Sequence, residues 1–164
     1  MNDEIEMLAV QVGDALRAQG RMLVTAESCT GGWVAQAITG IPGSSGWFDR
    51  GFVTYTNAAK QEMLGVREET LIAHGAVSEE TVREMAEGAL RRSHAQVAVA
   101  ISGVAGPGGG TPAKPVGMVC FAWAVQGQAT RSCTERFPGD RAEVRGRSVI
   151  RALRGILDVL HTTG

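Results

Sequence analysis

The feature that most constrains the fold is the stretch VTAESCTGG at residues 24–32. Residues 22–25 are typical of a short strand, two glycines then permit a sharp turn, and residues 33–38 form an apolar, helix-compatible run. Ser28 falls at the turn. Open α/β sheets bind ligands at the carboxyl ends of their strands, and the helix that follows offers free N–H groups to an anion. Ser28 is therefore a candidate nucleophile, although a helix N-cap is an equally good interpretation from spacing alone.

The rest of the sequence alternates strands and helices. This order predicts a three-layer α/β/α sandwich around a mostly parallel, mixed sheet of about five strands, with one antiparallel strand. We expect one domain over residues 1–164. Strands are expected at 22–25, 51–56, 96–102, 117–125 and 129–137, and helices at about 5–20, 33–39, 58–64, 67–74, 79–92 and 140–161.

Composition excludes several classes of function. A formal net charge of -1 and a pI near 6.3 give no electrostatic basis for binding nucleic acid. No apolar run approaches the length that spans a bilayer, and the N-terminus lacks the layout of a signal peptide. The three cysteines are odd in number and not at zinc-site spacing. We expect a cytoplasmic protein with no membrane or nucleic-acid partner, no metal and no cofactor.

Lys60 is the candidate base for Ser28. It lies one turn into the helix after the second expected strand, where the positive end of the helix dipole and any desolvation lower the pKa of an amine. A lysine that loses its proton near neutral pH can activate a serine. Tyr55, the only tyrosine, could relay a proton or orient Lys60. A surface lysine and a core tyrosine are the alternatives.

Cys29 is the competing nucleophile because it adjoins Ser28. Neither His74 nor His94 lies in a loop suited to catalysis, and His161 is near the end of the last helix. Cys29 is therefore interpreted as a small buried residue.

A glycine-rich loop follows the buried strand at 96–102. Backbone N–H groups in residues 103–110 can approach a phosphate closely, and Lys114 could add charge. The loop matches neither a dinucleotide-binding nor a Walker motif. Arg141 and Arg145 lie four residues apart and are suited to phosphate or carboxylate. A flexible loop and a solvated basic helix face remain open alternatives.

Together these motifs resemble the CinA C-terminal domain family. The resemblance covers roughly residues 5 to 160, and AESCTGG and AGPGGGTPAKPVG are its most specific parts. Because no amino-terminal molybdopterin-binding-like domain precedes them, we expect the stand-alone form. The other matching stretches are GWVAQAIT, IPGSSGWFDRGFVTYTNAAKQEMLGV, HGAVSEETVREMAEGAL and, more loosely, FPGDRAEVRGRS.

The resemblance implies a nicotinamide-nucleotide amidase that converts nicotinamide mononucleotide to nicotinate mononucleotide and ammonia, in the recycling of pyridine nucleotides. By matching position, Ser28 would be the nucleophile, Lys60 its base, and Tyr55 a support for proton transfer. Thr30, Gly31 and Gly32 would supply donors to the oxyanion. The residues implied to hold the rest of the substrate are Asn57, Ser102, Gly103, Gly106, Arg141 and Arg145.

A different class of function remains open. The family's link to competence and DNA damage would suit a non-catalytic module that binds a nucleotide or regulates a partner. A homo-oligomer is compatible with the apolar faces of the first and last helices, but helices that pack on their own sheet have the same pattern.

Overall fold

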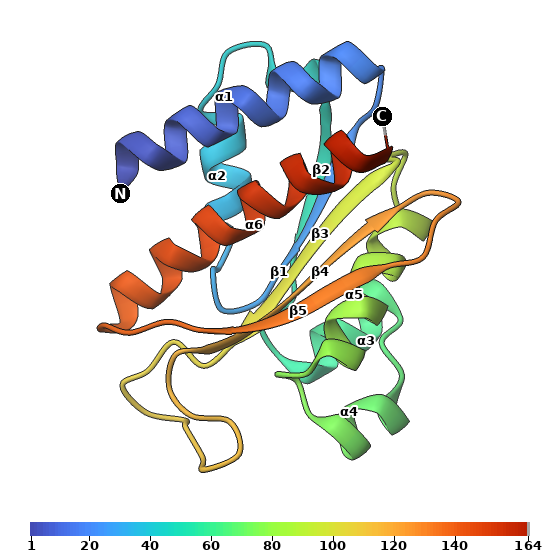
Figure 1. The fold of residues 1–164 in the computed structure, drawn as a ribbon. Helices are drawn as coiled ribbons and strands as arrows, with labels where there is room; N and C mark the ends of the chain where they lie inside the picture. Colours follow the sequence, from blue (N-terminus) through green and yellow to red (C-terminus); the bar gives the residue numbers. More distant parts are fainter. Residues whose placement is uncertain (164) are drawn as a thin grey trace.

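The computed structural model describes residues 1–163; Gly164, the end of the expected domain, lies outside them. Helices cover both faces of a five-stranded sheet, as the sequence predicted (Figure 1). The strands are β1 (Leu23–Glu27), β2 (Phe48–Val53), β3 (Val97–Gly103), β4 (Met118–Val125) and β5 (Arg131–Arg136). The helices are α1 (Asn2–Gln19), α2 (Trp33–Thr39), α3 (Asn57–Leu64), α4 (Glu68–His74), α5 (Glu79–Arg91) and α6 (Arg141–Thr163), with a 3-10 turn, η1, at Ser44–Gly46.

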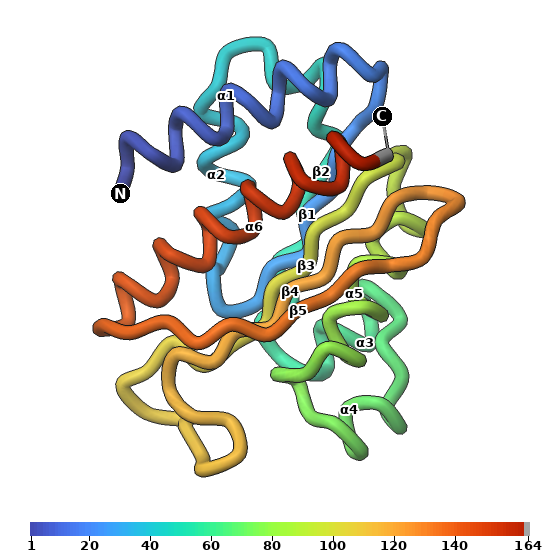
Figure 2. The backbone as a smooth tube through the Cα atoms, in the orientation of Figure 1, coloured from blue at the N-terminus to red at the C-terminus, as the bar shows by residue number. Residues whose placement is uncertain are grey.

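The strand order is β2-β1-β3-β4-β5. β1 pairs in parallel with both β2 and β3, whereas β3–β4 and β4–β5 are antiparallel, so β4 alone runs against the other four strands. From β1 the chain moves outward to β2 and then returns past β1 to form β3. The connection from β1 to β2 contains α2, and the connection from β2 to β3 contains α3, α4 and α5. The tube in Figure 2 shows α2 on one face of the sheet and the other three helices on the opposite face. The strand order therefore reverses between β1 and β3, where such sheets bind ligands.

Alternation along the central strands produces two different faces. Large side chains such as Val99, Ile101 and Phe121 face α1, α2 and α6. The small side chains of β1, β3 and β4 face α5 and α3. They are Ala26, Ala98, Ala100, Cys120, Ala122 and Ala124. Since alanines occupy little space, α5 packs close against the sheet. The sheet therefore separates two apolar cores, one on each of its faces.

Side chains cap the starts of α3 and α5. The hydroxyl of Thr56 accepts a hydrogen bond from the amide of Ala59 at 3.1 Å, and that of Ser78 accepts one from Thr81 at 3.1 Å. β2 differs from the prediction, because it begins at Phe48 and ends at Val53 rather than spanning 51–56. The amide of Thr54 makes a last hydrogen bond to the carbonyl of Glu27 at 2.8 Å, and the chain then turns into α3, which Thr56 caps.

None of the helices among residues 1–163 combines the length and the apolar character needed to cross a membrane.

Candidate active site

The candidate site lies at the point where the strand order reverses, at the carboxyl ends of β1 and β3. Ser28 follows β1 directly, and its amide donates to the carbonyl of Ile101 on β3 at 3.0 Å. Glu27 pairs with Ile101 in the parallel register, so the next residues, Ser28 and Ser102, emerge from neighbouring strands toward the same face. This is the face that α3 and α5 cover.

Lys60 reaches Ser28 from α3. Its Nζ lies 3.0 Å from Ser28 Oγ and also donates to the backbone carbonyls of Thr54, at 2.9 Å, and Tyr55, at 3.4 Å. The side chain is 1% exposed, and no carboxylate within hydrogen-bond distance balances its charge among the described residues. Burial therefore lowers the pKa of Lys60 from its ordinary value of 10.5, since desolvation penalises the ammonium.

Cys29 does not share this activation. Burial raises the pKa of its thiol to about 12, because desolvation disfavours the thiolate and Glu27 adds negative charge nearby. A thiolate at Cys29 would raise the pKa of Lys60, but the neutral thiol present near pH 7 does not. Cys29 also belongs to the apolar cluster under α1, α2 and α6. This environment agrees with the interpretation of Cys29 as a buried residue rather than a nucleophile.

A cavity of about 320 Å³ opens in front of Ser28 and Lys60. This volume lies within the range of small-molecule sites. No aspartate or glutamate is among its lining residues, whereas the guanidinium of Arg141 is, so the cavity favours an anionic ligand. The lining residues are Ser28, Cys29, Tyr55, Asn57, Lys60, Ala76, Val77, Ser102, Gly103, Val104, Ala105, Gly106, Gly108, Gly109 and Arg141.

Arg141 bridges two walls of this cavity. Its Nη1 donates to the carbonyl of Gly106 in the glycine-rich loop at 2.8 Å, and its Nη2 donates to the phenol oxygen of Tyr55 at 3.1 Å. Tyr55 is 59% exposed, so it is not the core residue that the pattern alone favoured. It is the backbone carbonyl of Tyr55 that contacts Lys60, while the phenol contacts Arg141.

Four of the residues expected to bind substrate do not line the cavity: Thr30, Gly31, Gly32 and Arg145. Thr30 is fully buried, and its hydroxyl donates to Glu27 Oε1 at 2.6 Å. The amide of Gly31 donates to the carbonyl of Ser28 at 3.0 Å. Gly31 and Gly32 have φ angles of 63° and 102°, so they are needed for the left-handed backbone of this turn. These residues build the turn that carries Ser28.

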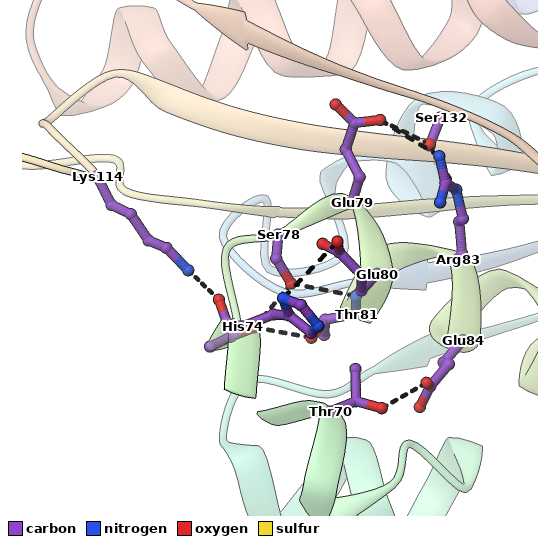
Figure 3. A network of polar contacts seen from close by, with 11 residues as sticks. Thr70, His74, Ser78, Glu79, Glu80, Thr81, Arg83, Glu84, Lys114 and Ser132 are labelled. Atoms are coloured by element: carbon purple, nitrogen blue, oxygen red, sulfur yellow. Dashed lines mark hydrogen bonds and ion pairs between the residues drawn. The ribbon is translucent and has the colours of Figure 1, made fainter. Parts of the chain in front are cut away.

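Lys114 also lies outside the catalytic cavity. Its amine donates to the backbone carbonyl of His74 at the end of α4, which ties the glycine-rich loop to the segment between α4 and α5 (Figure 3). A second cavity, of about 440 Å³, adjoins this contact, but its charged side chains already contact polar groups of the protein. Glu79, for example, accepts hydrogen bonds from Ser132 and Thr134, both at 2.8 Å.

One wall of the cavity and the role of Glu27 as a hydrogen-bond acceptor for the turn and α2 were missed in the sequence. Ala76 and Val77, in the connection between α4 and α5, form an apolar wall of the cavity. An alanine and a valine in a connection give no sequence signal for a binding site. Glu27 has a detectable signal: α2 begins at glycine, with no capping side chain and no acid in its first turn, so its amides require an acceptor elsewhere. No group of three or more His, Cys, Asp or Glu that could hold a metal ion occurs within the described part of the chain.

Comparisons with known proteins agree with this arrangement. The family model of the CinA C-terminal domain matches residues 5–160. The chain is 56% identical over 156 residues to nicotinamide-nucleotide amidohydrolase PncC of Escherichia coli K12, with 93% of each chain covered. It is 52% identical over 159 residues to the protein of that name from Pseudomonas putida, covering 96% of this chain and 98% of the relative. The crystal structure of the competence/damage inducible protein CihA from Agrobacterium tumefaciens matches with a TM-score of 0.93 at 48% identity over 96% of each chain.

Proposed function

Since this chain belongs to the CinA C-terminal domain family, we propose that it hydrolyses the carboxamide of nicotinamide mononucleotide, with Ser28 as nucleophile and Lys60 as general base. The products are nicotinate mononucleotide and ammonia. Relatives that are 52 to 56% identical carry the name nicotinamide-nucleotide amidohydrolase, so the chain is an amidase of the hydrolase class.

The observation that carries the mechanism is the 3.0 Å separation between Lys60 Nζ and Ser28 Oγ. A neutral amine has two N–H bonds and one lone pair. The carbonyls of Thr54 and Tyr55 can only accept hydrogen bonds, so they occupy the two N–H groups. The lone pair of Lys60 Nζ is then free to accept a hydrogen bond from the hydroxyl of Ser28. The contacts of Lys60 thus suit a base that is neutral in its resting state.

In the first half-reaction, Ser28 Oγ attacks the carboxamide carbon while Lys60 takes the hydroxyl proton. The carbonyl oxygen becomes an oxyanion. We assign its stabilisation to the amide of Cys29, which lines the cavity directly after Ser28 and donates to no backbone carbonyl within residues 1–163. As the C–N bond breaks, Lys60 returns its proton to the nitrogen and ammonia leaves. An ester to Ser28 remains.

In the second half-reaction, Lys60 accepts a proton from water, and the resulting hydroxide attacks the ester carbon. The ester C–O bond breaks and Lys60 returns the proton to Ser28 Oγ, so nicotinate mononucleotide is formed as the carboxylic acid, which gives its proton to solvent and leaves as the carboxylate. One water is consumed and one ammonia is released per turnover. Lys60 performs the proton transfers in both halves, so we propose that the reaction requires no metal ion.

The charge of the cavity supports a phosphorylated substrate. Lys60 is occupied with proton transfer, so Arg141 is the permanently charged cation available to the phosphate. Backbone amides of the glycine-rich loop, between Gly103 and Gly109, lie on the same wall and suit the same role. We assign Asn57 and Ser102, which also line the cavity, to polar contacts with the ribose and the carboxamide. The three cysteines are free, which suits the cytoplasm as the site of the reaction.

The direct test is ammonia release from nicotinamide mononucleotide, with and without EDTA. Turnover that EDTA does not change supports the proposal. Binding of the mononucleotide without ammonia release would support a non-catalytic nucleotide-binding module instead. Good activity on nicotinamide riboside combined with poor activity on the mononucleotide would reject the role of the phosphate.

A further inference from the structure

We propose that Glu27 and Arg145 are positioning residues that clamp the turn carrying Ser28 from its two sides. Neither residue lines the cavity, and each contacts the turn itself. This inference rests on the proposed function for its kinetic consequence. The clamp itself is a property of the turn and can be measured independently of turnover.

Glu27 holds the turn to the start of α2. Its carboxylate is 1% exposed and accepts three hydrogen bonds: from Thr30 Oγ1 at 2.6 Å, from the amide of Val34 at 2.9 Å and from the amide of Ala35 at 3.0 Å. A buried carboxylate is costly unless such donors satisfy it, and bonds to a charged acceptor are stronger than neutral ones. Glu27 immediately precedes Ser28, so this network fixes where the backbone leaves β1.

Arg145 holds the other side of the turn from α6. Its Nε donates to the carbonyl of Cys29 at 3.0 Å and its Nη2 to the carbonyl of Thr30 at 3.1 Å, while its guanidinium lies 5.8 Å from the ring centre of Trp33. In a trans peptide the C=O and N–H point in opposite directions. By fixing the carbonyl of Thr30, Arg145 therefore also orients the amide of Gly31, which donates to the carbonyl of Ser28 at 3.0 Å.

Arg141 provides a matched control on the same helix. It lies one turn before Arg145, has the same side chain and lines the cavity, whereas Arg145 does not. The clamp assigns different consequences to the same substitution at these two positions. Arg145→Gln disturbs the geometry of Ser28, and Arg141→Gln disturbs substrate binding.

The experiment compares Glu27→Gln, Arg145→Gln, Arg145→Lys and Arg141→Gln in the full-length protein. Steady-state kinetics on nicotinamide mononucleotide is combined with hydrogen–deuterium exchange over residues 28–36. For Glu27→Gln and Arg145→Gln we expect kcat to fall about 10- to 100-fold with KM within about threefold, because small displacements of a reacting group cost rates of this size. We expect Arg145→Lys, which keeps the charge but has a single donor nitrogen instead of the planar guanidinium, to lie between Arg145→Gln and the wild type. Arg141→Gln should instead raise KM.

Exchange separates failure of the clamp from failure of the proposed function. The clamp predicts faster exchange in residues 28–36 of Glu27→Gln and Arg145→Gln, with the central strands as protected as in the wild type. If the wild type releases no ammonia, the proposed function fails, and faster exchange still supports the clamp. Unchanged exchange in Arg145→Gln and Arg145→Lys would overturn the clamp. A raised KM with unchanged kcat in Arg145→Gln would also overturn it, by assigning Arg145 to the phosphate.

Discussion

Lys60 Nζ lies 3.0 Å from Ser28 Oγ, although the two residues are 32 positions apart and belong to elements on either side of β2. The contact exists because β1 and β2 are parallel neighbours, so the turn after β1 and the helix after β2 begin at the same edge of the sheet. Burial of Lys60 at this edge lowers the pKa of its amine, which is the direction that the proposed role of general base requires.

Removal of either side chain of this pair should abolish the reaction. For Ser28→Ala and Lys60→Met we expect a loss of at least about 10³-fold in kcat, because nucleophile and base act as one unit. The measurement is ammonia release by purified variants whose circular dichroism matches that of the wild type. Activity within about tenfold of the wild type in either variant would remove that residue from the mechanism.

Cys29→Ala should keep most of the activity. Its thiol is neutral, with a pKa of about 12, so it contributes no nucleophile near pH 7. We expect kcat within about threefold of the wild type and a modest loss of stability from the small cavity that the substitution leaves. Parallel assays after treatment with iodoacetamide provide a second measurement. Loss of activity comparable to that of Ser28→Ala would assign the chemistry to Cys29 instead.

The pKa of Lys60 also predicts how stability depends on pH. Burial lowers the pKa in the folded state, so between that value and 10.5 the unfolded chain binds one more proton than the folded chain. The free energy of unfolding contributed by this group therefore rises with pH through that window, by up to about 1.4 kcal/mol per pH unit. Denaturant unfolding of the wild type and of Lys60→Met should show this slope as the difference between the two proteins. Parallel curves would contradict a lowered pKa.

Gly88→Ala should reduce both stability and activity. A Cβ at Gly88 would overlap the backbone carbonyl of Leu64, at the end of the helix that carries Lys60. Alanine is the better helix former, yet the overlap forces α3 away from α5 and should cost about 1 to 3 kcal/mol. Gly46→Ala is the matched control, because nothing lies within 4 Å of its added Cβ. Equal thermal unfolding midpoints for the two variants would contradict this account.

Much of the fold was predictable because the local signals agree with one another. Thr56 and Ser78 cap helices, and the apolar residues 97–101 are typical of a central strand. These signals together predict the order of the elements and the three layers. The bounds of β2 were not predictable from propensity. The strand starts at Phe48 because Trp47, which is fully buried, already accepts a hydrogen bond from Leu23 and so joins the sheet early.

The site was predictable only in part. The sequence placed Ser28 directly after one strand and Lys60 one turn into the helix that follows another, and the parallel pairing of these two strands then brings the residues together. It could not say which side of the turn faces the cavity. That depends on the direction in which the carbonyls of Cys29 and Thr30 point, and both accept hydrogen bonds from Arg145, which is 115 residues or more away in the sequence. The roles of Asn57, Ser102, Gly103, Gly106 and Arg141 toward substrate stay predictions, as does assembly into a homo-oligomer.

The central claim is that an uncharged Lys60 activates Ser28. The most direct measurement is kcat/KM for ammonia release from nicotinamide mononucleotide between about pH 6 and about pH 9, in the wild type and in Lys60→Met. We predict a wild-type rate that rises with pH, by up to about tenfold per unit, and levels off above the lowered pKa of Lys60, while Lys60→Met stays near background throughout. A flat wild-type profile over this range, or substantial turnover by Lys60→Met, would contradict the account.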